Sequence, residues 1–87
     1  FSQEEKERIH RLVMVDKLLP DFGRDIERVS YTDGCKVRFQ GGGWVVTRFS
    51  GTEPLLRVFC EMSGEREAAD VAACMERFLD LEGRNIE

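Results

Sequence analysis

The residues with the clearest chemical potential lie in one short segment, Arg48–Arg57. Ser50 and Thr52 can donate hydrogen bonds from their hydroxyl groups, and they flank Gly51, around which successive backbone N–H groups can converge on an anion. Arg48 can add a bidentate, charge-assisted pair, which is stronger than a neutral hydrogen bond. The combination indicates a site for a phosphate dianion. The same residue types also occur in ordinary hairpin turns, so that interpretation stays open on spacing alone.

Glu53 is the residue of this segment that opposes anion binding, because a carboxylate repels a phosphate unless it is engaged elsewhere. We expect it to form an ion pair that orients Arg48 or Arg57. In a simple hairpin register Arg57 is expected to point to the opposite sheet face from Arg48. The loop would then have to twist to bring the two arginines together on one phosphate.

The other reactive side chains form no catalytic or metal-binding motif. Cys35, Cys60 and Cys74 are widely spaced, and the single histidine, His10, is far from all three in sequence, so nothing indicates a zinc site. We expect buried free thiols in a reducing, cytoplasmic compartment. His10 has no nucleophile or carboxylate placed beside it in a motif and is expected to be structural, on the exposed or flanking side of a helix.

The glycine run at 41–43 resembles a phosphate loop in composition only. It lacks the spacing of a P-loop, and a strand follows it rather than the helix N-terminus that such loops require. Trp44, which starts that strand, is expected to pack in the core or at its rim.

Two amphipathic helices are predicted at the ends of the chain. Ser2 and Glu5 fit a capping box, an apolar stripe follows, and Pro20 stops the helix, so the first is expected over residues 3–19. Apolar residues at i, i+3, i+4 and i+7 predict the second over residues 65–81.

The middle of the chain has the period-two pattern of strands. Asp33-Gly34 is a strong hairpin signal, and further turn residues separate the later apolar runs. Strands are expected over residues 26–31, 35–40, 44–49 and 55–62. Short connections favour antiparallel pairing, and both helices need one apolar face to cover. The predicted fold is therefore α+β, a four-stranded antiparallel sheet with two helices on one face in the order α-β-β-β-β-α.

Composition limits the functional classes. The 87 residues allow one domain, 34% of them are charged, and the net charge is -4. The longest apolar run is far shorter than a membrane span requires, so no membrane partner is expected. Mild acidity and the lack of an evident basic face argue against nucleic acid as a partner. The chain opens with Phe1 rather than Met, and we expect it to be a fragment of a longer protein.

The reactive segment resembles a known family. Arg48-Phe49-Ser50-Gly51-Thr52-Glu53-Pro54, followed by Arg57-Val58-Phe59-Cys60-Glu61, is similar to the R-x-S-G-T-E-P…R-V-x-x-E signature of the α-D-phosphohexomutases, in their fourth, C-terminal domain. The resemblance covers nearly all of the chain, and we expect residues 1–87 to form this one domain. Position 49 is often proline in the family and is Phe here. The closest branch looks like phosphoglucomutase/phosphomannomutase, with phosphoglucosamine mutase as the alternative.

The resemblance implies a TATA-binding-protein-like fold and a share in an isomerase, an intramolecular phosphotransferase. Such enzymes interconvert hexose 1-phosphate and hexose 6-phosphate through a bisphosphorylated sugar. A phosphoserine and a Mg²⁺ ion, both on other domains of the same chain, perform the transfer, so this domain alone would be neither catalytic nor metal-binding. Carried over by position, the residues that bind the substrate phosphate are Arg48, Ser50, Gly51, Thr52 and Arg57.

A second interpretation uses the same residues without an attached enzyme. The chain would then be a free-standing regulatory module that binds a sugar phosphate or another anion. Residues preceding this chain in the parent protein would discriminate, because a serine loop and an Asp-rich metal loop there would identify the enzyme.

Overall fold

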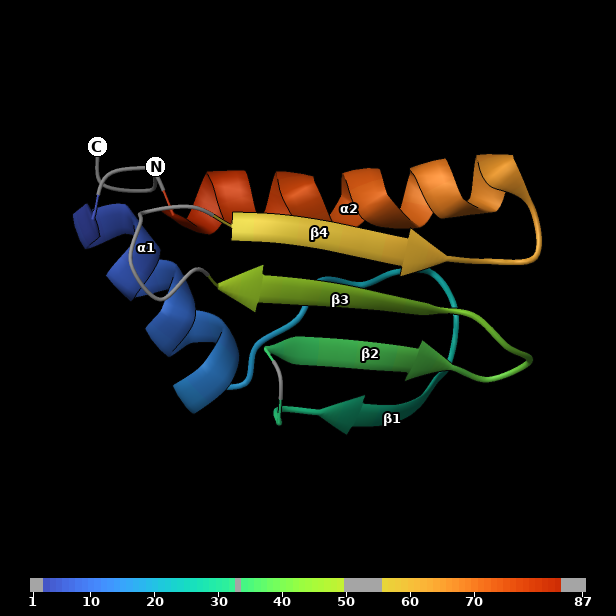
Figure 1. Ribbon diagram of the computed structural model, residues 1–87, viewed down its shortest axis with the longest axis horizontal. Coiled ribbons are helices and arrows are strands. Elements are labelled where there is room, and N and C mark those ends of the chain that lie inside the picture. The colour runs from blue at the N-terminus through green and yellow to red at the C-terminus, as the bar shows by residue number, and fades with distance from the viewer. Residues whose placement is uncertain (1–2, 33, 50–55, 84–87) are drawn as a thin grey trace.

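The computed structural model describes residues 3–32, 34–49 and 56–83, and it has the predicted α+β architecture (Figure 1). Four antiparallel strands form one sheet in the order β1-β2-β3-β4. The elements in chain order are α1 (Gln3–His10), η1 (Arg11–Val15), β1 (Ile26–Ser30), β2 (Cys35–Phe39), β3 (Trp44–Phe49), β4 (Leu56–Glu61) and α2 (Glu65–Gly83).

The antiparallel order gives the sheet two distinct ends. At one end, called here the loop end, the turn between β1 and β2 lies beside the end of β3 and the start of β4, and the first helix passes close by (Figure 1). At the other, the glycine end, Gly41–Gly43 join β2 to β3, and β4 leaves the sheet for α2. The segment between β3 and β4, residues 50–55, lies outside the described residues.

One face of the sheet packs against the helices and forms the core. On β2 the side chains of Cys35, Val37 and Phe39 are buried, whereas Arg38 between the last two is exposed, as the period-two pattern predicts. The helices add Ile9 and Val13 from the first and, from α2, Val71, Met75 and Leu79. Each fully buried aliphatic or aromatic side chain contributes about 1.5–3 kcal/mol of transfer free energy. This core fixes which residues of each strand remain outside.

The first helix ends earlier than expected. The sequence predicts a helix to residue 19, but α1 widens into the π-helical turn η1 and ends at Val15. The Asp16 N–H donates to the Arg11 carbonyl at 2.8 Å, and Lys17 then adopts φ 59°, in the left-handed region, which closes the helix. Pro20 is therefore not the residue that stops it. Ser2 of the predicted capping box lies outside the described residues.

The described residues contain no helix that is both long and apolar enough to cross a membrane. All three cysteines are free. Cys35 is buried as expected, but Cys60 and Cys74 are only partly buried. Cys60 packs against the margin of the core, and the Cys74 thiol donates to the Asp21 carbonyl at 3.6 Å.

Candidate functional site

Strands β3 and β4 place the two arginines of the reactive segment side by side. Arg48 pairs directly with Arg57 across the antiparallel ladder, one position before Phe49 pairs with Leu56. Directly opposed residues of an antiparallel pair project from the same face, with Cβ atoms about 4.5–5.5 Å apart. The expectation that Arg57 points to the opposite face from Arg48 is therefore wrong, and no twist is needed to bring them together.

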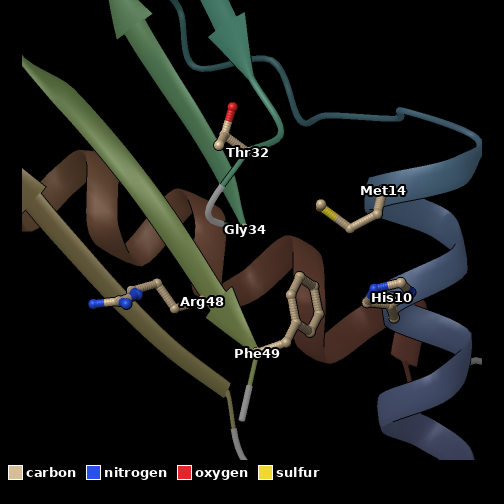
Figure 2. Close-up of a pocket in the computed structure, with 6 residues that line it drawn as sticks. All are labelled: His10, Met14, Thr32, Gly34, Arg48 and Phe49. Carbon is tan, nitrogen blue, oxygen red and sulfur yellow. The ribbon is translucent and has the colours of Figure 1, made fainter. Parts of the chain in front are cut away.

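Both arginines lie on the exposed face, away from the helices. Their strand neighbours Thr47, Phe49, Leu56 and Val58 are the ones that turn towards the core side. Figure 2 shows the Arg48 side chain extending away from Phe49 and from the first helix. Arg48 therefore does not enter the apolar interior, which is the orientation a binding residue requires.

Phe49 connects the end of β3 to the first helix. Its ring meets His10 edge-on, with ring centroids 5.0 Å apart and an interplanar angle of 72° (Figure 2). His10 is exposed, as the sequence predicts. The contact holds the last residue of β3 against α1 and so fixes the point from which residues 50–55 depart.

A small open pocket of about 230 Å³ adjoins this point (Figure 2). Its lining comes from the first helix, the β1–β2 turn and the end of β3: His10, Met14, Thr32, Gly34, Arg48 and Phe49. Gly34 has φ 89° and lies so close to the backbone of Thr47 and Arg48 that a side chain there would collide with the Thr47 carbonyl oxygen. The turn is thus packed directly onto the strand that carries Arg48.

Three of the predicted site residues, Ser50, Gly51 and Thr52, lie outside the described residues, as does Glu53 with its expected ion pair. Within the described part of the chain, neither Arg48 nor Arg57 forms an ion pair with a carboxylate. The structure therefore brings together the two predicted cationic residues at the entrance and exit of that segment.

The reactive side chains elsewhere offer no second chemical centre in the described ranges. Burial raises the pKa of the Cys35 thiol to about 11, and burial also raises that of Cys60 against a smaller opposing effect of Arg24, so neither is poised as a thiolate nucleophile. No group of three or more His, Cys, Asp and Glu residues in the described part of the chain could hold a metal ion.

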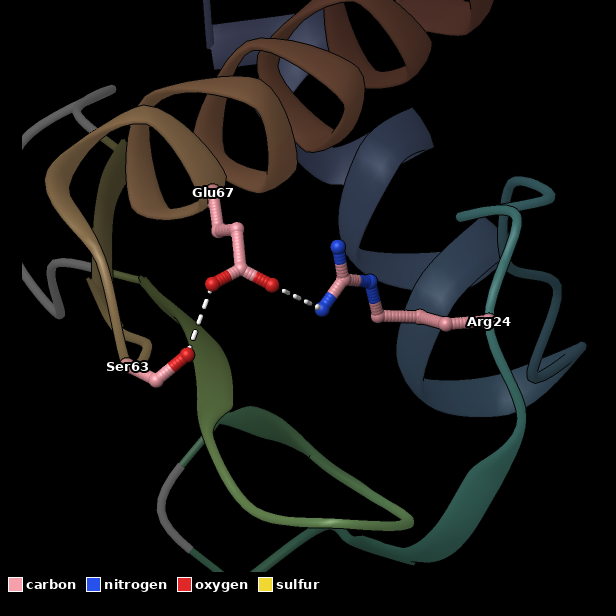
Figure 3. A network of polar contacts seen from close by, with 3 residues as sticks. All are labelled: Arg24, Ser63 and Glu67. Carbon is pink, nitrogen blue, oxygen red and sulfur yellow. Dashed lines mark hydrogen bonds and ion pairs between the residues drawn. The ribbon is translucent and has the colours of Figure 1, made fainter.

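The glycine end of the sheet carries a different polar arrangement (Figure 3). The Ser63 hydroxyl donates to Glu67 at 2.6 Å, and Arg24 forms an ion pair with the other carboxylate oxygen at 3.5 Å. The hydrogen bond from Ser63, and after it the Arg24 guanidinium, lower the pKa of Glu67. Glu67 therefore neutralises the charge of Arg24 within the chain.

The exposed face of the sheet is basic, a feature that the sequence analysis missed. The strand register aligns Arg28 with Arg38 on β1 and β2, Lys36 lies two residues from Arg38, and the Arg48–Arg57 pair completes the set. The chain therefore has a basic face, contrary to the expectation from its sequence. The signal was present, since the polar members of the alternating strands are mostly Lys or Arg, but only the register shows that they share one face.

Trp44 belongs to this exposed face rather than to the core. It pairs with Arg38 on one side and Glu61 on the other, and the Lys36 ammonium lies 4.7 Å from the centre of its ring. Of the two expected positions for Trp44, core or rim, the core is excluded, because the neighbouring Val45 occupies the buried position and Trp44 is only partly buried.

Comparison with known proteins supports the family resemblance that the segment with these arginines indicates. The family model described as "Phosphoglucomutase/phosphomannomutase, C-terminal domain" matches residues 3–78. A phosphoglucomutase/phosphomannomutase of Thermococcus kodakarensis is 44% identical over 43 residues, covering 49% of this chain and 9% of the relative. A probable phosphoglucosamine mutase of Methanopyrus kandleri is 36% identical over 80 residues, covering 83% and 17% respectively.

A phosphoglucosamine mutase of a Geobacter species is 32% identical over 100 aligned positions, covering 97% of this chain and 22% of the relative. The chain thus spans less than a quarter of the length of these curated relatives. No solved structure gives a significant match. Because the family model covers most of the described residues, the chain belongs to the family of phosphoglucomutase/phosphomannomutase C-terminal domains.

Proposed function

We propose that this domain anchors the phosphate group of a hexose phosphate that is not being transferred, as part of a phosphohexomutase. The observation that carries the proposal is the direct cross-strand pairing of Arg48 with Arg57 on the exposed face, at the strand ends that bound residues 50–55. Like charges directly opposed on a sheet destabilise it. A phosphate dianion bound between them would convert that repulsion into attraction.

The chemistry of the guanidinium group suits this role. Arginine remains charged at all physiological pH values, and its planar fork matches two oxygens of a phosphate at once. Ser50, Gly51 and Thr52 would complete the site with hydroxyl and backbone donors, which is the arrangement that the family resemblance implies. Glu53, the carboxylate that could compete for these arginines, lies outside the described residues.

The names of the relatives indicate the substrate class. They are mutases of phosphoglucose, phosphomannose and phosphoglucosamine, and the part common to these substrates is a phosphorylated hexose. A site that contacts only the phosphate accepts all three sugars. It also accepts a bisphosphorylated intermediate in either orientation, which a reversible shift between the 1- and 6-positions requires.

Anchoring the non-reacting phosphate also serves the reaction itself. Binding energy at a remote group holds the reacting group in position and lowers the entropic part of the barrier. The family resemblance assigns the phosphoserine and the Mg²⁺ ion to other domains of the longer enzyme. The role proposed for this chain is to bind and orient.

Isothermal titration and amide NMR of the 87-residue chain with glucose 6-phosphate test the proposal. We expect a dissociation constant in the millimolar range, about 4 kcal/mol of binding free energy, and shifts concentrated at the ends of β3 and β4. Arg48→Ala and Arg57→Ala should each weaken binding about tenfold, since each removes one charge-assisted pair. In the longer enzyme Arg48→Ala should lower kcat/KM at least tenfold, again on the order of 1.4 kcal/mol.

Arg66→Ala is the matched control, because it removes one exposed arginine from α2 without touching the sheet. It should bind glucose 6-phosphate as the parent chain does. Equal affinities for the parent chain, Arg48→Ala and Arg57→Ala would contradict the proposal.

A further inference from the structure

The glycine end of the sheet carries a second cavity, which the proposed function does not use. Its volume is about 560 Å³, against about 230 Å³ for the pocket beside Phe49. The β2–β3 hairpin and the end of β4 line it, together with Arg24 and Glu67. A volume of this order is typical of small-molecule sites, which span roughly 300–1,000 Å³.

This cavity is separate from the proposed phosphate site. Trp44, which lines it, lies four residues along β3 from Arg48, a distance of about 13 Å at the rise of a strand. Arg48 and Arg57 are at the loop end and do not line the cavity. A ligand here would therefore bind independently of one held by the two opposed arginines.

Three side chains form a row across the exposed face at the glycine end. Trp44 pairs directly with Arg38 on β2 and with Glu61 on β4, and all three line the cavity. Directly opposed residues have Cβ atoms about 4.5–5.5 Å apart, so Trp44 has a guanidinium on one side and a carboxylate on the other. The Lys36 ammonium lies 4.7 Å from the centre of the Trp44 ring, but Lys36 does not line the cavity. The cavity therefore meets Trp44 on a side that this contact leaves open.

The charges around the cavity are balanced, and one of each sign is unpaired. Arg24 and Glu67 form an ion pair of 3.5 Å (Figure 3). The side chains of Arg38 and Glu61 have no hydrogen-bond or ion-pair partner among the described residues. A guanidinium only donates hydrogen bonds and a carboxylate only accepts them, so the two together fit a ligand that offers both. A hydroxyl group does so, whereas Glu61 would repel a phosphate.

The hairpin leaves the cavity accessible because it lacks side chains. Gly41 and Gly42 have φ of 84° and 111°, and no atom lies within 4 Å of the point where a side chain would begin at either position. A ligand can therefore approach the backbone of the hairpin directly.

We propose that this cavity binds an uncharged sugar, with a pyranose ring stacked on Trp44 and its hydroxyl groups hydrogen-bonded to Arg38 and Glu61. The face of an aromatic ring is negative, so it attracts the C–H groups on one face of a pyranose. Ligand pockets combine such an aromatic wall with a few polar groups that fix the orientation of the ligand. This would be a second binding function, independent of the proposed phosphate anchor.

NMR of the 87-residue chain tests the proposal, with cellobiose as the probe. The substituents of its β-linked glucose ring are all equatorial, so both faces of that ring present C–H groups. Sorbitol is the comparison ligand, since it has similar hydroxyl groups but no ring. We expect cellobiose to shift the indole N–H of Trp44, the single tryptophan, and the amides of Gly41–Gly43, with a dissociation constant in the millimolar range. Sorbitol should leave these signals unchanged.

Arg38→Ala/Glu61→Ala removes both unpaired charges and leaves the net charge of the chain unchanged. It should weaken cellobiose binding about tenfold or more, because both polar contacts are lost. Arg66→Ala/Glu76→Ala is the matched control, since it removes the same two residue types from exposed positions of α2 outside the cavity. It should change the affinity less than about twofold.

The aromatic contact is tested separately. Trp44→Val should abolish binding of cellobiose, whereas Trp44→Phe should retain part of the affinity because it keeps an aromatic face. Urea unfolding of all four variants establishes that each is folded under the conditions of the titration.

Four results would overturn the inference. Cellobiose could leave the Trp44 indole and the glycine amides unshifted, or sorbitol could shift them equally. The two double variants could bind cellobiose with the same affinity. Finally, inorganic phosphate could displace cellobiose, which would identify this cavity as an anion site.

Discussion

The arginines at the two ends of the sheet have different neighbours. At the glycine end, Arg24 is neutralised within the chain by Glu67, which also accepts a hydrogen bond from Ser63 (Figure 3). At the loop end, Arg48 and Arg57 are opposed to each other, with no carboxylate partner in the described residues. An arginine with an internal partner can contribute to stability, whereas two directly opposed arginines favour an external anion, as the proposed function requires.

The largest expected effect comes from the glycines at the two ends. Gly34→Ala should destabilise the chain by about 2–4 kcal/mol, since it adds a left-handed alanine and a collision with the Thr47 carbonyl oxygen. Gly41→Ala, at φ 84° with open space around it, should cost about 1 kcal/mol from its backbone conformation alone. Urea unfolding measures both. Equal losses would show that the turn is not packed against β3.

The difference between the two ends can also be removed by introducing a carboxylate at the loop end. Arg57→Glu places a carboxylate opposite Arg48. The loop end would then have an internal ion pair, as the glycine end does, in place of two unpaired arginines. Binding of glucose 6-phosphate should fall by more than about tenfold, beyond the loss in Arg57→Ala, because a negative charge is added as well. Thermal stability should stay equal or rise slightly. A variant that still binds the sugar phosphate would refute the assignment of this pair.

The smallest effect is expected at Glu67, because its ion pair lies at the surface. Its pKa is lowered in the folded chain, first by the hydrogen bond from Ser63, so its stabilising contribution is present above the ordinary value of 4.5 and is lost as the pH falls below it. Glu67→Gln should therefore lower the melting temperature slightly at pH 7 and lose that difference at pH 3. Glu76→Gln, on the exposed side of the same helix, is the control for charge.

The sequence predicts the elements well where side-chain alternation alone determines them. β3 has the expected bounds, and the buried set on β2 is the predicted one, because burial of every second residue is a local property of a strand. The first helix was predicted too long, because the end depends on a single left-handed residue, Lys17, which has no side-chain signature for that conformation.

The site was less accessible to sequence reasoning, because it depends on register. Arg48 and Arg57 share a face because Phe49 pairs with Leu56, which leaves an even number of residues between the paired strand ends. An odd number would have placed the two arginines on opposite faces. The basic character of the exposed sheet face was missed for the same reason. Each cation is visible in the sequence, but their alignment across β1 and β2 appears only once the strands are paired.

The register of β4 against β3 has a practical consequence for engineering. A slip by a single residue would expose Leu56, Val58 and Cys60 to water and drive Arg57 beneath the helices, so the hydrophobic core forbids it. A folded variant that retains Arg48 and Arg57 therefore keeps them directly opposed across β3 and β4. Libraries that diversify residues 50–55 can thus vary the segment between the two strands while Arg48 and Arg57 stay in register.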